Sequence, residues 1–114
     1  MKQYESGLNG EQIAEAYLLR KGLSVIERRY RAEDGEIDLI LSDGEYVVFA
    51  EVKYRPHSSA GAGLSAITQK KQQRMTHAAL RYLADHDLTD MPVRFDAVEI
   101  TRDGILHIPH AFMP

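Results

Sequence analysis

Two apolar runs separated by an Asp-Gly pair most constrain the fold of this 114-residue chain. In the segment GEIDLILSDGEYVVFAEVKY, residues 35–54, the runs Ile37–Leu41 and Tyr46–Ala50 flank Asp43-Gly44. Asp-Gly is a favoured centre of a two-residue hairpin turn, so the runs are predicted to pair as antiparallel strands. The first run nevertheless contains an acid, Asp38, and the second run is followed by the triplet Glu51-Val52-Lys53.

The rest of the chain predicts a mixed sheet covered by helices. Two more Asp-Gly pairs, at residues 34–35 and 103–104, are also flanked by strand-like runs, and two segments have helical periodicity. A strand, a long helix and another strand favour a right-handed crossover. The expected elements are a helix at 8–21 ending before Gly22, strands at 24–31, 36–41 and 46–54, a helix at 64–85, and strands at 93–101 and 105–108, with PHAFMP as a tail. The order is αβββαββ, an α/β fold in a single domain, residues 1–114.

Composition limits the function classes. No apolar run approaches the roughly 20 residues of a membrane span, and the first residues lack the apolar core of a secretory signal. Together with the absence of Cys, this predicts a cytoplasmic protein. The net charge of −3 argues against a simple nucleic-acid coat. Any polyanionic partner is therefore expected to meet a local basic patch.

Pairing around Asp43-Gly44 brings acidic residues together. It places Asp38 opposite Phe49 and Glu36 opposite Glu51, so Asp38, Glu51 and Lys53 share one face and a metal ion fits between the first two. A three-residue loop or a bulge would instead turn Asp38 to the other face. Periodicity leaves both arrangements open, because both faces of these strands are apolar.

The first helix supplies another acid. Helical spacing places four apolar residues on one side of this helix: Leu8, Ala14, Leu18 and Leu19. Glu11 lies in the middle of the apolar stripe, beside Leu8, Ala14 and Leu18, where an acid is costly unless it is paired or binds a metal. Such a carboxylate set holds Mg²⁺ or Mn²⁺ and serves phosphodiester cleavage. Lys53 would orient the attacking water and stabilise the developing charge.

Structural explanations compete with each of these assignments. Asp38 could form an ion pair with Arg31 across the strands, and an isolated Glu-x-Lys at a strand end is most often a solvated pair. Glu11 could be half exposed, and Glu15 more so. A nucleic-acid-binding or adaptor module without turnover, and a structural or protein-interaction domain, therefore remain alternatives to an enzyme.

Basic residues are candidates for contacting phosphates. The second helix carries Lys70, Arg74, His77 and Arg81 along one face, whereas Lys71 falls in the apolar stripe of Leu64, Ile67, Met75, Ala78 and Tyr82. Lys71 must therefore extend to solvent or face a charged site, and we expect it near the carboxylates or the scissile phosphate. The arginines at 28, 29, 31 and 55, with Tyr30 and Tyr54 as stacking surface, add to this end of the sheet.

Several segments resemble a known family. GEIDLI (35–40), VFAEVKYR (48–55), GAGLSAITQKKQQRM (61–75), AALRYL (78–83) and RFDAVEI (94–100) are similar to the YraN/UPF0102 family of small bacterial proteins. The resemblance implies a restriction-endonuclease-like core of the PD-(D/E)xK superfamily, akin to archaeal Holliday junction resolvases. It also implies an endonuclease acting on DNA, with branched or structured DNA as the expected substrate.

The resemblance assigns roles to individual residues. Asp38 matches the motif aspartate, Glu51-Val52-Lys53 the E-x-K, and Glu11 the helical acid. The implied metal site is Glu11, Asp38, Glu51 and Val52; the implied catalytic set is Glu11, Asp38, Glu51 and Lys53; the expected DNA contacts are Arg29, Arg31, Arg55, Lys70, Lys71 and Arg74. Arg29 departs from the family's usual Asn. Resolvases act as dimers, and Ile13, Ala16 and Tyr17 offer apolar surface for a homodimer.

Overall fold

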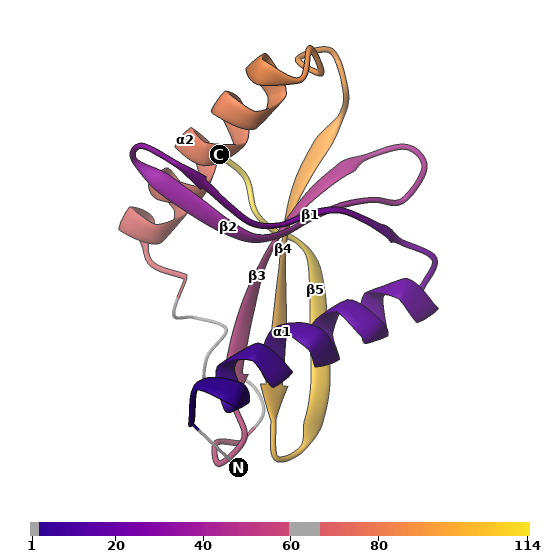
Figure 1. Cartoon of the computed structure of the whole chain (residues 1–114), viewed down its shortest axis with the longest axis vertical. Helices are drawn as coiled ribbons and strands as arrows, with labels where there is room; N and C mark the ends of the chain where they lie inside the picture. The colour runs from indigo at the N-terminus through magenta and orange to yellow at the C-terminus, as the bar shows by residue number, and fades with distance from the viewer. Residues whose placement is uncertain (1–2, 60–66) are drawn as a thin grey trace.

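The computed structural model describes residues 3–59 and 67–114, and its elements follow the predicted αβββαββ order (Figure 1). They are α1 (Gln3–Arg20), β1 (Ser24–Ala32), β2 (Gly35–Ser42), β3 (Val47–Arg55), α2 (Gln69–Asp85), β4 (Val93–Thr101) and β5 (Gly104–Phe112). Helix α1 begins earlier than predicted and ends as predicted before Gly22, whose φ of 97° is the left-handed conformation that glycine adopts readily. In the described part of the chain, neither helix is long and apolar enough to cross a membrane.

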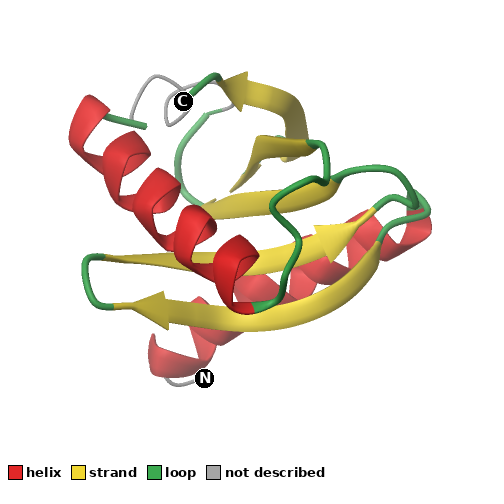
Figure 2. Cartoon of the chain, turned by 90° about the horizontal axis from the view of Figure 1, so that it is seen from above, coloured by secondary structure: helices red, strands yellow, loops and turns green. Residues whose placement is uncertain are grey.

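The five strands form one mixed sheet in the order β1-β2-β3-β4-β5. Only β3 and β4 run parallel, and α2 is the crossover between them. The remaining neighbours are antiparallel. The two helices cover opposite sides of the sheet (Figure 2). The predicted fold class, a mixed central sheet flanked by helices, is therefore confirmed.

The strand register differs from the prediction. Ser42 pairs with Val47, so the β2–β3 loop has four residues rather than two. The Asp43 carboxylate accepts hydrogen bonds from the backbone N–H groups of Glu45 and Tyr46, and this side-chain turn competes with the two-residue hairpin. The pairing is displaced by two residues, an even number that keeps the paired residues 39–42 on their predicted faces. Beyond this pairing the alternation of β2 is broken, because Ile37 and Ile40 both pack under α2. At the β1–β2 and β4–β5 turns, Gly35 and Gly104 are the first strand residues rather than turn centres.

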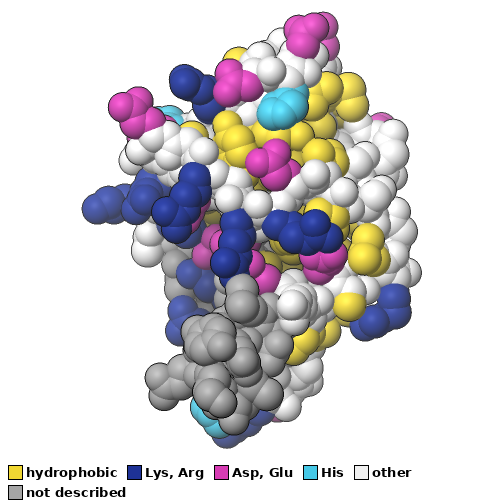
Figure 3. All heavy atoms as spheres, in the orientation of Figure 1, with side chains coloured by type: hydrophobic (Ala, Val, Ile, Leu, Met, Phe, Trp, Pro, Cys, Tyr) yellow, Lys and Arg dark blue, Asp and Glu magenta, His cyan; other side chains and the backbone are white. Residues whose placement is uncertain are grey.

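The sheet opens between β2 and β3. Their pairing ends at Leu39 and Ala50, whereas β3 remains paired with β4 as far as Arg55. In Figure 1 the β1–β2 hairpin crosses the other strands at a steep angle. The space-filling view of the same face shows a band of Lys and Arg side chains across the middle of the molecule, with Asp and Glu side chains between them (Figure 3).

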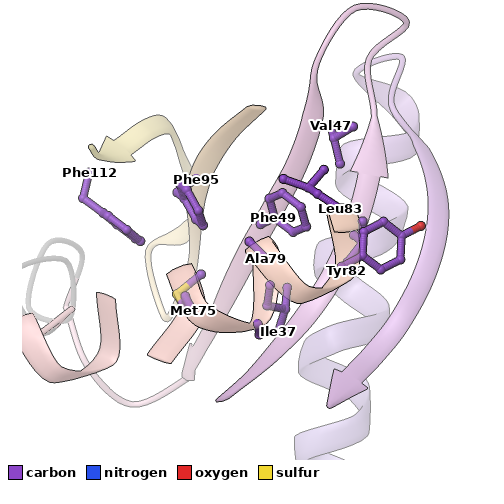
Figure 4. Packing of buried hydrophobic residues seen from close by; sticks show 11 residues of the cluster. Ile37, Val47, Phe49, Met75, Ala79, Tyr82, Leu83, Phe95 and Phe112 are labelled. Atoms are coloured by element: carbon purple, nitrogen blue, oxygen red, sulfur yellow. The ribbon is translucent and has the colours of Figure 1, made fainter. Parts of the chain in front are cut away.

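Two hydrophobic clusters hold the helices on the sheet. Met75, Ala79, Tyr82 and other α2 side chains pack against Ile37, Phe49 and Phe95 (Figure 4). On the other face, Ala14 and Leu18 of α1 pack with residues of β2, β3 and β4. Gly35 allows α2 to approach β2 closely, because an added Cβ would lie 1.9 Å from the Arg74 carbonyl oxygen.

Three expectations about packing and element boundaries are wrong. Leu19, assigned to the buried side of the first helix, is 45% exposed. Helix α2 begins at Gln69 after the N-cap Thr68, not at residue 64; Leu64 itself lies outside the described residues, as does the side chain of Leu8. The supposed C-terminal tail contributes to β5, and Phe112 joins the cluster under α2.

Candidate active site

Asp38 lies where β2 separates from β3. Its Oδ2 accepts a hydrogen bond of 2.8 Å from the Val52 backbone N–H, taking the place of a backbone carbonyl just beyond the last β2–β3 pair. The proposed Asp38–Arg31 ion pair does not form, since Arg31 contacts Glu36 at 3.5 Å instead. Where the backbone pairing of β2 with β3 ends, the Asp38 side chain therefore accepts the hydrogen bond that a backbone carbonyl would otherwise accept.

Glu51 lies on β3 and faces α2. Alternation along β3 places Phe49 in the cluster under α2 and Ala50 in the cluster under α1, so Glu51 and Lys53 share the α2 face. Glu51 Oε2 is 3.3 Å from Lys53 Nζ, and Oε1 is 3.4 Å from Lys71 Nζ. The side chain is only 6% exposed, and its Oε1 has no hydrogen-bond partner. A buried carboxylate is therefore held between two ammonium groups.

The surroundings of Asp38 raise its pKa. Burial, followed by the negative charge of Glu51, raises this pKa from 3.8 to about 7, against the lowering effect of the hydrogen bond from the Val52 N–H. Glu11 makes a smaller contribution in the same direction. A pKa raised by burial and a charged neighbour is typical of functional sites.

Glu11 stands apart from this pair. Its Oε1 accepts a hydrogen bond of 2.9 Å from Arg29 Nε. Glu11, Arg29 and Asp38 line one cavity of about 250 Å³. The Glu15 side chain is less exposed than that of Glu11, the reverse of the expectation. Glu15 accepts two hydrogen bonds from Arg28, and these lower the pKa of the Glu15 carboxyl.

The predicted convergence of three acids is not found. Among the residues that the structure describes, no three acidic, histidine or cysteine side chains are grouped closely enough to hold a metal ion. Asp38 and Glu51 still suit a hard divalent cation, because Mg²⁺ commonly uses one or two protein carboxylates and completes its shell with water and substrate oxygens. Glu51 Oε1, which has no hydrogen-bond partner, offers a donor atom for the cation. Val52, whose side chain packs on the α1 face, could offer only its backbone carbonyl.

The basic residues are distributed around this site. Lys71 lies beside Glu51, where its place in the apolar stripe predicted a charged partner. Arg31 and Arg74 line a neighbouring cavity of about 220 Å³ with Gly35 and Glu36. Lys70 and Arg55 are exposed. Three of the predicted DNA contacts, Arg29, Arg31 and Lys71, thus already have acidic partners.

The tyrosines do not provide the expected stacking surface. Tyr30 packs edge-on against Tyr82 at the margin of the core, with 5.3 Å between ring centroids. Tyr54 packs with the α1 cluster close to Gly10.

Sequence reasoning also missed two acids in β4. Glu99 is fully buried and is in register with Lys53 on the adjacent strand. Asp96 is fully buried as well and contacts Arg94 and His107 at 3.1 and 2.8 Å. The signal was present in RFDAVEI, because an acid within an apolar strand is the same pattern that drew attention to Asp38.

The architecture is that of a restriction-endonuclease-like core, with an acid at the fork of a mixed sheet and a Glu-x-Lys triplet on the adjacent strand. The chain belongs to the family described as "Uncharacterised protein family UPF0102", which it matches over residues 10–100. It is 41% identical over 115 residues to the UPF0102 protein of Hahella chejuensis, covering 98% of this chain and 93% of that relative.

Other relatives agree with this assignment. The UPF0102 protein of Alkalilimnicola ehrlichii is 44% identical over 109 residues, covering 95% of this chain and 86% of the relative. The UPF0102 protein of Beutenbergia cavernae is 42% identical over 106 residues, covering 91% and 90%.

Proposed function

We propose that this protein is a metal-dependent endonuclease that cleaves phosphodiester bonds of DNA in the cytoplasm. The observation that carries the proposal is the pair of carboxylates, half-buried Asp38 and buried Glu51, at the fork of the sheet beside Lys53. Withdrawing two neighbouring acids from water is costly for a purely structural domain. Recruitment of a cation and a phosphate would offset that cost.

The proposed site uses Mg²⁺ or Mn²⁺. Asp38, Glu51 and the Val52 carbonyl would hold the ion, with Glu11 lining the cavity from α1. When bound, such an ion polarises the scissile phosphate and lowers the pKa of bound water. The Lys53 ammonium, 3.3 Å from Glu51 Oε2, would orient the attacking water and stabilise negative charge developing on the phosphate.

The basic surface supports a polyanionic substrate. Arg31 and Glu36 line both cavities, which places Arg74 beside the acidic site along a shared wall. Lys70 and Arg55 add exposed cations. Branched or otherwise structured DNA is the proposed substrate, by analogy with resolvases, and a homodimer would suit a two-fold junction.

Cleavage assays test the proposal directly. Linear, nicked, flapped and four-way DNA are incubated with Mn²⁺ and the protein, beside Asp38→Ala, Lys53→Ala and a control, Asp90→Ala, in the loop before β4. We expect the unaltered protein and the control to cut at least one substrate. Each site variant should be slower by about 100-fold or more, the usual effect of removing one charge-stabilising group. Equal cleavage by all variants would point to a contaminating nuclease.

A binding module without turnover is the second candidate. It is favoured by the two lysines that already neutralise Glu51 and by the pairing of Glu11 with Arg29. Under this alternative the protein retains affinity for DNA at several salt concentrations, yet cuts none of the substrates with Mg²⁺ or Mn²⁺.

A further inference from the structure

The first turn of α2 brings a second lysine to the candidate active site. Lys71 Nζ lies 3.4 Å from Glu51 Oε1, on the opposite carboxylate oxygen from Lys53. We propose that Lys71 is a displaceable counter-ion, which neutralises Glu51 in the absence of a divalent cation and contacts a substrate phosphate once the cation occupies that place. This inference rests on the proposed function.

The two lysines are held differently. Lys53 lies within β3, paired in register with β4, and its side chain is 20% exposed. Lys71 is in the first turn of a helix, with a side chain that is 29% exposed. Its backbone N–H is held by the Thr68 hydroxyl at 3.1 Å, so the base of the side chain is fixed while the four-carbon stem leaves the ammonium free to swing. Lys71 is thus the lysine suited to leave Glu51.

The charges around Glu51 favour such a movement. Two acids and two lysines lie at the site, Asp38 and Glu51 with Lys53 and Lys71, and buried Glu99 is in register with Lys53 on β4. A divalent cation bound at Glu51 would lie against the Lys71 ammonium, and like charges in contact repel each other. Release of Lys71 would free Glu51 Oε1 to bind the cation. The negative charge of the incoming phosphate would then neutralise the Lys71 ammonium.

Glu51 Oε1 is the atom at issue. It is buried and has no hydrogen-bond partner, so its contact with Lys71 is electrostatic only. Lys70, the neighbouring residue on α2, is exposed. The chain therefore offers a matched pair of substitutions, Lys71→Met and Lys70→Met, which remove the same charge from adjacent positions and keep an unbranched side chain.

Metal binding is the first readout. Titration calorimetry with Mn²⁺ at about pH 8, above the pKa of Asp38, compares the unaltered protein with the two variants. We expect Lys71→Met to bind Mn²⁺ about tenfold more tightly, because a competing charge in direct contact with Glu51 has been removed. Lys70→Met should change the affinity less than about twofold, as expected for an exposed charge. Equal affinities for the two variants would overturn the inference.

DNA binding is the second readout and requires no turnover. Affinity for the preferred DNA is measured with Ca²⁺, which takes the same oxygen ligands, and again with chelator. Lys71→Met should weaken binding about tenfold with Ca²⁺ and less than about twofold with chelator, since without a cation Lys71 is engaged with Glu51. The effect of Lys70→Met should be the same in both conditions.

The outcomes separate this inference from the function on which it rests. A loss of DNA affinity in Lys71→Met that is independent of Ca²⁺ would show a permanent phosphate contact and overturn the displacement, leaving the proposed function standing. Failure of the unaltered protein to bind Mn²⁺ would overturn both. Thermal unfolding of each variant checks that the helix remains folded.

Discussion

Replacing Asp38 with Asn should make the folded protein more stable while removing the proposed activity. Asn keeps a carbonyl oxygen for the Val52 N–H but cannot ionise. The folded-state pKa of Asp38 is about 7 against 3.8 ordinarily, so the folded protein holds this proton more tightly than the unfolded chain does. The stability contributed by protonated Asp38 is fully present below about pH 4 and is lost as the pH rises to about 7.

The size of the effect follows from that difference. Each pH unit between the two pKa values corresponds to about 1.36 kcal/mol, so ionised Asp38 costs the folded protein up to about 4 kcal/mol above pH 7. Between about pH 5 and pH 8 the unaltered protein should lose about 2–3 kcal/mol relative to Asp38→Asn, because the folded-state titration of Asp38 falls in this range.

Urea unfolding of both proteins at about pH 5 and pH 8 measures this difference directly. Asp90→Asn, an exposed substitution of the same kind, is the control and should show no such pH dependence. A constant difference between Asp38→Asn and the unaltered protein at both pH values would refute the reasoning. So would a less stable variant at pH 8.

Two further substitutions test the fold that holds the site. Gly35→Ala should destabilise the protein by about 2 kcal/mol, because its Cβ would meet the Arg74 carbonyl oxygen of α2; an unchanged urea midpoint would show that α2 can move away cheaply. Asp96→Ala should cost about 3 kcal/mol, since it leaves the enclosed His107 without its acid and leaves Arg94 with Asp43 as its remaining carboxylate partner. Thermal unfolding beside Asp90→Ala measures this loss, and equal midpoints for the two variants would contradict it.

The sequence predicted the architecture and part of the site. The order of the elements was predicted from the apolar periodicity and from the Asp-Gly pairs between strands. The position of Lys71 in an apolar helical stripe predicted that it faces a charged group. The β2–β3 register was wrong because the Asp43 side chain forms its own turn with Glu45 and Tyr46. The resulting displacement by two residues still left the paired residues 39–42 on the predicted faces.

The partners of individual charges could not be predicted. Helical periodicity placed Glu11 toward the sheet, but its pairing with Arg29 depends on an irregular strand, in which Arg29 has a φ of 53°. That left-handed conformation is one that Asn adopts more readily than most residues, which accounts for the Asn expected at this position from the family resemblance. No periodicity rule anticipates such a local distortion.

The fork between β2 and β3 places the two carboxylates on different parts of the sheet. Asp38 belongs to the β1–β2 hairpin, whereas Glu51 lies on β3, which is paired with β4 along its whole length. The hydrogen bond from Val52 to Asp38 joins one part to the other. A ligand that bridges both carboxylates would therefore cross-link the β1–β2 hairpin to β3 beyond the last pair of the ladder.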